Sequence, residues 1–154
     1  NGTALMVAFG TSAALWWLYF DEVGWRAQRF LSQSHDSGRL ARDAYTYLHI
    51  PIVAGIIVVA VGDELVIAHP GAHPSGVELA VILGGPVLYL VGHTLFRLRM
   101  IHNVSRKRVV ATAALLALAP LGDTLTSLGL AACVLAILAV LAGSETRHRL
   151  LATP

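Results

Sequence analysis

Charged residues are scarce in this sequence, where Asp, Glu, Lys and Arg together make up 13% of 154 positions. Soluble domains carry about 25% charged residues, so the chain has roughly half the usual supply for covering a surface in water. Hydrophobic residues make up 56% of the chain, and its mean hydropathy is +0.68. This balance disfavours a soluble helical domain and indicates an integral membrane protein.

Cysteine and the common catalytic motifs are also missing or nearly so. The single cysteine, Cys133, lies in an apolar run and cannot form a disulfide within the chain, and no Cys/His spacing typical of zinc sites occurs. The P-loop, HExxH, GxSxG and CxxC patterns are absent from the sequence. His69 and His73 lie in a Pro/Gly-rich turn without metal-ligand spacing. We therefore expect no metal, no cofactor, no catalytic residue and no enzymatic activity.

Long apolar segments dominate what is present, and several approach the roughly 20 residues that cross a bilayer as a helix. They predict an all-α fold, a polytopic transmembrane helix bundle in one domain. The fourth segment is short, since an apolar run of about 13 residues gives about 20 Å of helix, and whether it spans the membrane stays open. A polar loop with room for a short amphipathic helix is expected after the first span. The about five expected spans cover residues 3–20, 44–68, 77–96, 109–121 and 125–142.

The basic residues are confined to three segments. All 11 Lys and Arg residues fall in the loops 21–43 and 97–108 and in the C-terminal tail, whereas the turn at 69–76 has none. With five spans these three segments share one side of the membrane. The positive-inside rule then predicts that they are cytoplasmic and that residue 1 lies on the opposite side of the membrane. On this interpretation the charge marks orientation and contact with lipid headgroups, so we expect no nucleic-acid partner.

Ionisable residues inside spans are costly and point to functional sites. In the second span Tyr45 and His49 are four residues apart and share a helix face, and Pro51 frees a carbonyl about one turn earlier. His49 could serve as a proton relay, as a ligand for an ion or substrate, or as a hydrogen-bonded packing residue. In the third span Tyr89 and His93 share a face in the same way, and His93 is expected at the depth of His49.

Asp63 is the strongest single candidate for a functional role. It lies close to four helical turns from His49 on nearly the same face, and Gly55 and Gly62 lie near that face too. This stripe is either a packing seam with occasional polar groups or the wall of a pathway. Together the second and third spans supply a candidate polar pathway of five residues, Tyr45, His49, Asp63, Tyr89 and His93.

The third span also contains the sequence Gly84, Gly85 and Pro86. Discontinuous helices form substrate and ion sites in many transporters because the freed backbone groups coordinate ligands. These three residues are therefore a candidate helix break, with an ordinary kink as the alternative.

Several of these segments resemble the bacterial low temperature requirement A (LtrA) family. The most specific is YTYLHIPIVAGI at residues 45–56, continuing to VGDE at 61–64 and AHP at 68–70. Supporting matches are LWWLYFD at 15–21, LGGP at 83–86 and GHTLF at 92–96. The resemblance covers most of residues 1–108, and the last two apolar segments match in character only.

The resemblance implies a multi-pass bacterial inner-membrane protein roughly twice this length. The N-terminal motifs of the family are absent here, and the chain starts at Asn1 without a basic leader, unlike a signal peptide. We therefore expect the C-terminal half of a longer chain, with the bilayer and the N-terminal half of the same protein as partners and with homo-oligomerisation left open. The family is named for growth in the cold, and no residue role can be carried over from it.

Three functions are compatible with the sequence. The first is a transporter or channel-like protein for an unidentified solute or ion, with the candidate polar pathway lining the route. The second is a structural or sensory membrane protein that supports growth at low temperature without transport. The third, an enzyme acting on lipid, is disfavoured because no catalytic constellation is present.

Overall fold

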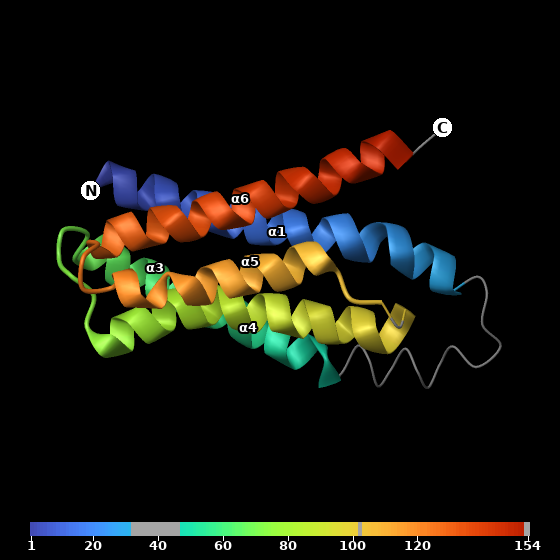
Figure 1. Cartoon of the computed structure of the whole chain (residues 1–154), viewed down its shortest axis with the longest axis horizontal. Coiled ribbons are helices and arrows are strands. Elements are labelled where there is room, and N and C mark those ends of the chain that lie inside the picture. Colours follow the sequence, from blue (N-terminus) through green and yellow to red (C-terminus); the bar gives the residue numbers. More distant parts are fainter. Residues whose placement is uncertain (32–46, 102, 153–154) are drawn as a thin grey trace.

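The computed structural model describes residues 1–31, 47–101 and 103–152, and these contain helices and no strand. Figure 1 shows the helices running along one common long axis. This confirms the all-α bundle. The elements in chain order are α1 (Gly2–Leu31), α3 (His49–Ala68), α4 (Gly76–Ile101), α5 (Arg106–Ala117), the 3-10 helix η1 (Ala119–Leu121) and α6 (Ser127–Ala152).

Four of these helices are long and apolar enough to cross a membrane, over Gly2–Phe20, His49–Ala68, Gly76–Arg99 and Ser127–Arg147. Helix α5 has 12 residues. At 1.5 Å per residue it is about 18 Å long, well short of a hydrocarbon core of about 30 Å. The described part of the chain is therefore a bundle of four candidate membrane-crossing helices with a shorter fifth helix packed among them.

The ends of several helices differ from the expected spans. Helix α1 continues beyond Phe20 to Leu31, so the loop does not begin at residue 21, and the short helix for which it had room around residues 25–31 is the continuation of α1. Likewise α4 continues to Ile101 and α6 to Ala152. Hydropathy marks the length of helix that is compatible with hydrocarbon, whereas a helix can continue into water until a breaking residue ends it. The rest of the expected first loop, and Tyr45 at the start of the expected second span, lie outside the described residues.

The predicted helix break at Gly84, Gly85 and Pro86 is also wrong, because α4 is helical throughout and holds Pro86 in its interior. Gly85 serves the packing of α4 on α3 instead. A Cβ atom added to Gly85 would lie 2.7 Å from the backbone nitrogen of Val59. Small residues at such positions let two membrane helices approach closely, and this contact accounts for Gly85 without a break.

The end of the bundle that carries the 69–75 turn is tied by local hydrogen bonds. At the start of α4 the Ser75 nitrogen donates to Glu78 Oε2 at 2.7 Å, and the Glu78 nitrogen donates to Ser75 Oγ at 3.3 Å. This is a capping box, which satisfies the first N–H groups of a helix. The start of α6 is held by the turn before α4, since the Ser127 nitrogen donates to the Ala72 carbonyl at 2.8 Å.

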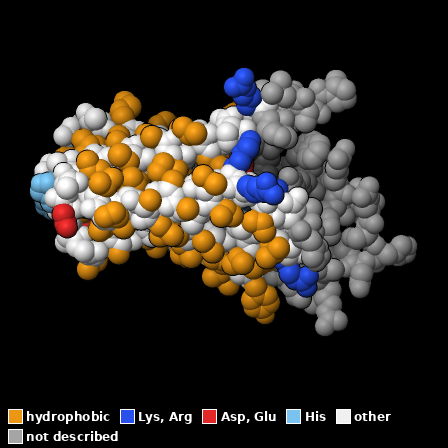
Figure 2. Space-filling view, in the orientation of Figure 1, with side chains coloured by type: hydrophobic (Ala, Val, Ile, Leu, Met, Phe, Trp, Pro, Cys, Tyr) orange, Lys and Arg blue, Asp and Glu red, His pale blue; other side chains and the backbone are white. Residues whose placement is uncertain are grey.

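The described basic residues gather at one end of the bundle. They lie where α4 and α6 end and where α5 begins, and the N-terminus and the 69–75 turn lie at the opposite end (Figure 1). Figure 2 shows Lys and Arg side chains at one end, acidic and His side chains at the other, and hydrophobic side chains between. We call the first of these the basic end; the members whose side chains the structure describes are Arg97, Arg99, Arg106, Lys107, Arg108 and Arg147.

Candidate functional site

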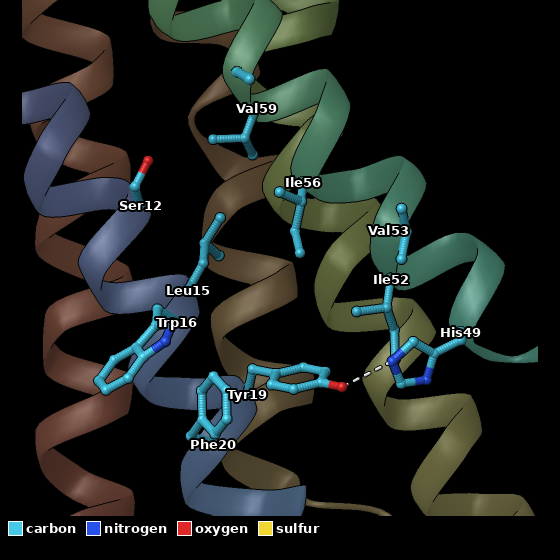
Figure 3. Close-up of a pocket in the computed structure, with 11 residues that line it drawn as sticks. Ser12, Leu15, Trp16, Tyr19, Phe20, His49, Ile52, Val53, Ile56 and Val59 are labelled. Atoms are coloured by element: carbon cyan, nitrogen blue, oxygen red, sulfur yellow. Dashed lines mark hydrogen bonds between the residues drawn. The ribbon is translucent and has the colours of Figure 1, made fainter. Parts of the chain in front are cut away.

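A cluster of tyrosine and histidine side chains joins three helices on the side of the basic end. The hydroxyl of Tyr19, from α1, forms a hydrogen bond of 2.8 Å with Nε2 of His49, from α3. The ring of Tyr19 also lies edge-on to the ring of His93, from α4, with 5.8 Å between their centroids. Tyr19 therefore lies against both histidines, and Figure 3 shows its hydroxyl directed at His49.

The α4 side of this cluster is fully enclosed. Tyr89 and His93 both have 0% of their surface exposed, and their rings are 4.6 Å apart. The hydroxyl of Tyr89 donates a hydrogen bond of 2.7 Å to the carbonyl of Leu15 in α1. The i, i+4 spacing of Tyr89 and His93 thus turns one polar face of α4 toward α1. We call Tyr19, His49, Tyr89 and His93 the Tyr–His cluster.

Of the five residues of the predicted pathway, the structure brings His49, Tyr89 and His93 together, and Tyr45 lies outside the described residues. Asp63 is elsewhere, 14 positions along α3 from His49, which is about 21 Å of helix. It borders a separate space of about 10 Å³ with Thr11 and Pro86 among its neighbours. That volume is about one probe sphere, and none of the residues that line it belongs to the Tyr–His cluster.

The stripe between His49 and Asp63 is a packing seam. Gly55 and Gly62 are both buried on α3. A Cβ atom added to Gly55 would lie 2.6 Å from the backbone nitrogen of Tyr89, and one added to Gly62 would lie 3.4 Å from the Cα of Ile82. Of the two interpretations of this stripe, close contact between α3 and α4 is the one that the structure supports.

A groove between α1 and α3 adjoins the cluster, and we call it the α1/α3 groove. It has a volume of about 400 Å³ and ends at the hydrogen bond between Tyr19 and His49. Its remaining lining is almost entirely apolar, with Trp16 and Phe20 more than half exposed on its α1 side. Figure 3 shows these side chains flanking Tyr19. The lining residues are Ser12, Leu15, Trp16, Tyr19, Phe20, His49, Ile52, Val53, Ile56, Val59 and Ala60.

Sequence reasoning missed two polar features near the cluster. Tyr19 is not among the five residues of the predicted pathway, and nothing in its local pattern indicates contact with histidines on two other helices. Arg108 and Glu145 were assigned to a loop and a tail. In the structure Arg108 is fully buried and its Nε and Nη2 atoms contact Glu145 Oε1 at 3.0 Å and Oε2 at 2.9 Å. No sequence signal links these two residues, because 37 positions separate them.

This ion pair is part of a junction between α1, α5 and α6. Nη2 of Arg108 also lies 3.5 Å from the carbonyl oxygen of Leu18. Nearby, Nε1 of Trp17 donates to Oγ1 of Thr146 at 2.9 Å. Two-point contact between guanidinium and carboxylate is among the strongest of polar interactions. The junction therefore holds the short helix α5 against the two long helices beside the Tyr–His cluster.

The described residues contain no group of three or more His, Cys, Asp or Glu side chains close enough to hold a metal ion. The polar groups of the site are phenol, imidazole and one bidentate ion pair. These groups can exchange protons or bind a polar solute through hydrogen bonds.

The family model described as "Bacterial low temperature requirement A protein (LtrA)" matches residues 2–143. The chain belongs to the bacterial low temperature requirement A family. The match includes α5 and much of α6, so membership in the LtrA family extends beyond the residues that carry the resemblance in the sequence. It also contains every member of the Tyr–His cluster.

One curated relative is the "Uncharacterized protein RA0937" of Rhizobium meliloti (strain 1021), which is 36% identical over 88 residues. The aligned part covers 57% of this chain and 22% of that protein, so this LtrA chain matches only a minor part of its relative's length. No solved structure matches the chain.

Proposed function

We propose that this chain is part of a transporter or channel-like protein of the bacterial inner membrane, with its basic end in the cytoplasm. The observation that carries the proposal is the Tyr–His cluster, in which Tyr19 meets His49 and His93 inside a bundle of membrane-crossing helices. Ionisable side chains in such bundles are costly, and they mark substrate and ion pathways or proton relays.

The chemistry of the cluster favours movement of protons. Phenol and imidazole groups each donate and accept hydrogen bonds, so the 2.8 Å bond between Tyr19 and His49 is a path along which a proton can pass. His93 lies edge-on to the Tyr19 ring, with 5.8 Å between the ring centroids, and is fully buried. In this proposal the cluster controls the transfer of protons between the basic end and the interior of the protein. It has no catalytic role.

The α1/α3 groove supports a pathway that is shared with another part of the same protein. Only 28% of the membrane-crossing windows of α1 and α3 is buried, against 44% for α4. Helices with so much uncovered surface have room to pack against further protein. The aligned part of the chain covers 22% of the length of its relative. We propose that the rest of the protein forms the opposite wall of the route, with the lipid bilayer around both.

Proteoliposomes that contain the full-length protein and a trapped pH-sensitive dye test this proposal. A potassium gradient with valinomycin drives protons through any conducting protein, and the dye reports the rate above that of empty vesicles. We expect a measurable rate for the natural protein and a loss of about tenfold or more for Tyr19→Phe and His49→Gln, in line with the usual contribution of a positioned proton-transfer group.

Tyr47→Phe is the matched control, because Tyr47 is 68% exposed and belongs to no polar contact of the cluster. A natural rate in both Tyr19→Phe and His49→Gln would remove the cluster from the mechanism. A natural protein that moves protons no faster than empty vesicles would refute the proton-conducting form of the proposal.

A structural or sensory role without transport is the second candidate, and one observation favours it. The polar groups of the bundle bond to one another, as Tyr89 does to the Leu15 carbonyl and Arg108 does to Glu145. Such bonds stabilise helix packing by themselves. On this alternative, Tyr19→Phe lowers the thermal stability of the protein and leaves every flux at the level of empty vesicles.

A further inference from the structure

A second groove lies between α5 and α6, and we call it the α5/α6 groove. Its volume is about 540 Å³. It exists because small side chains occupy the facing positions, with Ala111 and Ala114 one turn apart on α5 and Ala136 on α6. The lining residues are Arg106, Lys107, Val110, Ala111, Ala114, Ala136, Ile137, Val140, Leu141 and Ser144.

The outer rim of this groove faces away from the bundle. Val110 is 66% exposed and Val140 is 72% exposed, one on each of the two helices. In a chain with four candidate membrane-crossing helices, apolar side chains this exposed are placed to meet lipid tails rather than water. The α5/α6 groove is thus a hollow on the apolar belt that Figure 2 shows between the two polar ends.

Positive charge is concentrated at one end of the groove. Arg106 and Lys107 begin α5, and both are exposed. Nζ of Lys107 donates a hydrogen bond of 2.7 Å to the carbonyl of Ser144 on α6, which holds the ammonium group across the groove. An ammonium group has three N–H donors, so two remain for an anion.

The next residue, Arg108, does not add to this exposed charge, because it is buried and contacts Glu145. The start of α5 does add to it, since the N-terminal end of a helix carries partial positive charge. Its N-cap residue, Ser105, makes no side-chain capping hydrogen bond. An apolar hollow that ends in two cations and a helix N-terminus is complementary to a phospholipid. The tails would lie in the hollow and the phosphate at the cations.

We propose that the α5/α6 groove binds an anionic phospholipid, with an acyl chain along the alanine-lined hollow and the headgroup phosphate between Arg106 and Lys107. The charge selects an anionic over a zwitterionic lipid, because the latter brings its own cation to the basic end. The bound lipid fills the space between α5 and α6 and so fastens the helix that is too short to span the membrane. This inference is independent of transport.

Lipid binding to the full-length protein, purified in detergent and stripped of lipid, tests the inference by native mass spectrometry. The probes are phosphatidylglycerol, phosphatidylcholine with the same tails, and inorganic phosphate. Each basic residue near a membrane surface contributes about 1 kcal/mol of attraction to anionic lipid, which is about fivefold in affinity. We therefore expect Arg106→Gln with Lys107→Gln to weaken phosphatidylglycerol binding roughly 30-fold and to leave phosphatidylcholine binding unchanged.

Arg99→Gln is the matched control, because Arg99 is an exposed cation of the basic end that does not line the groove. Ala114→Phe fills the hollow, and we expect it to weaken binding of both lipids. Thermal unfolding and gel filtration of each variant verify that it is folded. If Ala114→Phe does not fold, the two charge variants alone test the inference.

Four results would overturn the inference. Equal affinity for the two lipids would show that the cations do not select the headgroup. Displacement of phosphatidylglycerol by inorganic phosphate would show a site for a free anion. An equal loss of affinity in Arg99→Gln would show a general effect of surface charge. No lipid retained by the full-length protein would show that another part of the protein covers the groove.

Discussion

Glu145→Gln removes the negative charge from a carboxylate that contacts a fully buried guanidinium through two hydrogen bonds of 3.0 and 2.9 Å. The amide that replaces it can accept one such bond but cannot neutralise Arg108. Breaking a buried ion pair by removing one partner costs about 3–5 kcal/mol, because the other charge stays in a medium of low polarity. The side chain of Glu145 is 14% exposed, so water at the basic end offsets part of this cost. We expect a loss of about 3 kcal/mol.

The thermal unfolding midpoint of the full-length protein in detergent measures this loss. For soluble domains of 150–250 residues, 1 kcal/mol corresponds to about 2–4 °C, so we expect Glu145→Gln to lower the midpoint by about 6–12 °C. Arg108→Lys keeps the charge but loses two-point contact, and we expect a smaller decrease. Arg99→Gln, an exposed cation at the same end, is expected to change the midpoint by little.

The double variant Arg108→Met with Glu145→Met separates the ion pair from the packing of its side chains. Replacing both members of a buried pair by apolar groups of similar volume is often neutral for stability. We therefore expect the double variant to be clearly more stable than Glu145→Gln. A midpoint for Glu145→Gln within 2 °C of the natural protein, or a double variant that loses the sum of two single changes, would refute the argument that a buried, coupled pair is present.

Three further predictions follow from other contacts. Gly85→Ala places a Cβ against the backbone of α3 and should destabilise the protein by about 1–3 kcal/mol, whereas Gly84→Ala meets nothing within 4 Å and should be neutral or slightly stabilising in the same unfolding assay. Tyr89→Phe removes the hydroxyl that donates to the Leu15 carbonyl, which keeps its helical N–H donor inside α1, and should cost about 0.5–1.5 kcal/mol, with no loss expected if that bond is not made. Single cysteines at Arg99 and His73, in a protein without Cys133, should react with an impermeant thiol reagent from opposite faces of the membrane, and labelling from one face would contradict the orientation.

The class of the protein and the places of its helices could be predicted from the sequence, for a reason that applies to each segment separately. A helix in contact with lipid must be apolar over about 20 residues, whatever its neighbours are. Residues 49–68 and 76–99 meet this requirement in the sequence and in the structure. The ends were less well predicted, because the helix containing residues 2–20 continues to Leu31 through residues that hydropathy assigns to water.

Periodicity also predicted which residues share a face of one helix. Tyr89 and His93 are four positions apart, and their rings are in contact in the structure. The predicted break at Gly84, Gly85 and Pro86 was wrong because α4 is continuous there, and Gly85, which weakens a helix alone, permits close contact with a second helix. Which of these effects dominates depends on the neighbour, and the neighbour is not visible in a local pattern.

The contacts between helices were decided by the tertiary structure alone. The sequence indicates the depth of His49 and His93, but only the rotation and tilt of α1 bring Tyr19 against both of them. The same packing joins Arg108 to Glu145 across 37 positions. Spacing along one helix determines depth and face, whereas the direction in which that face points is determined by how all the helices pack together.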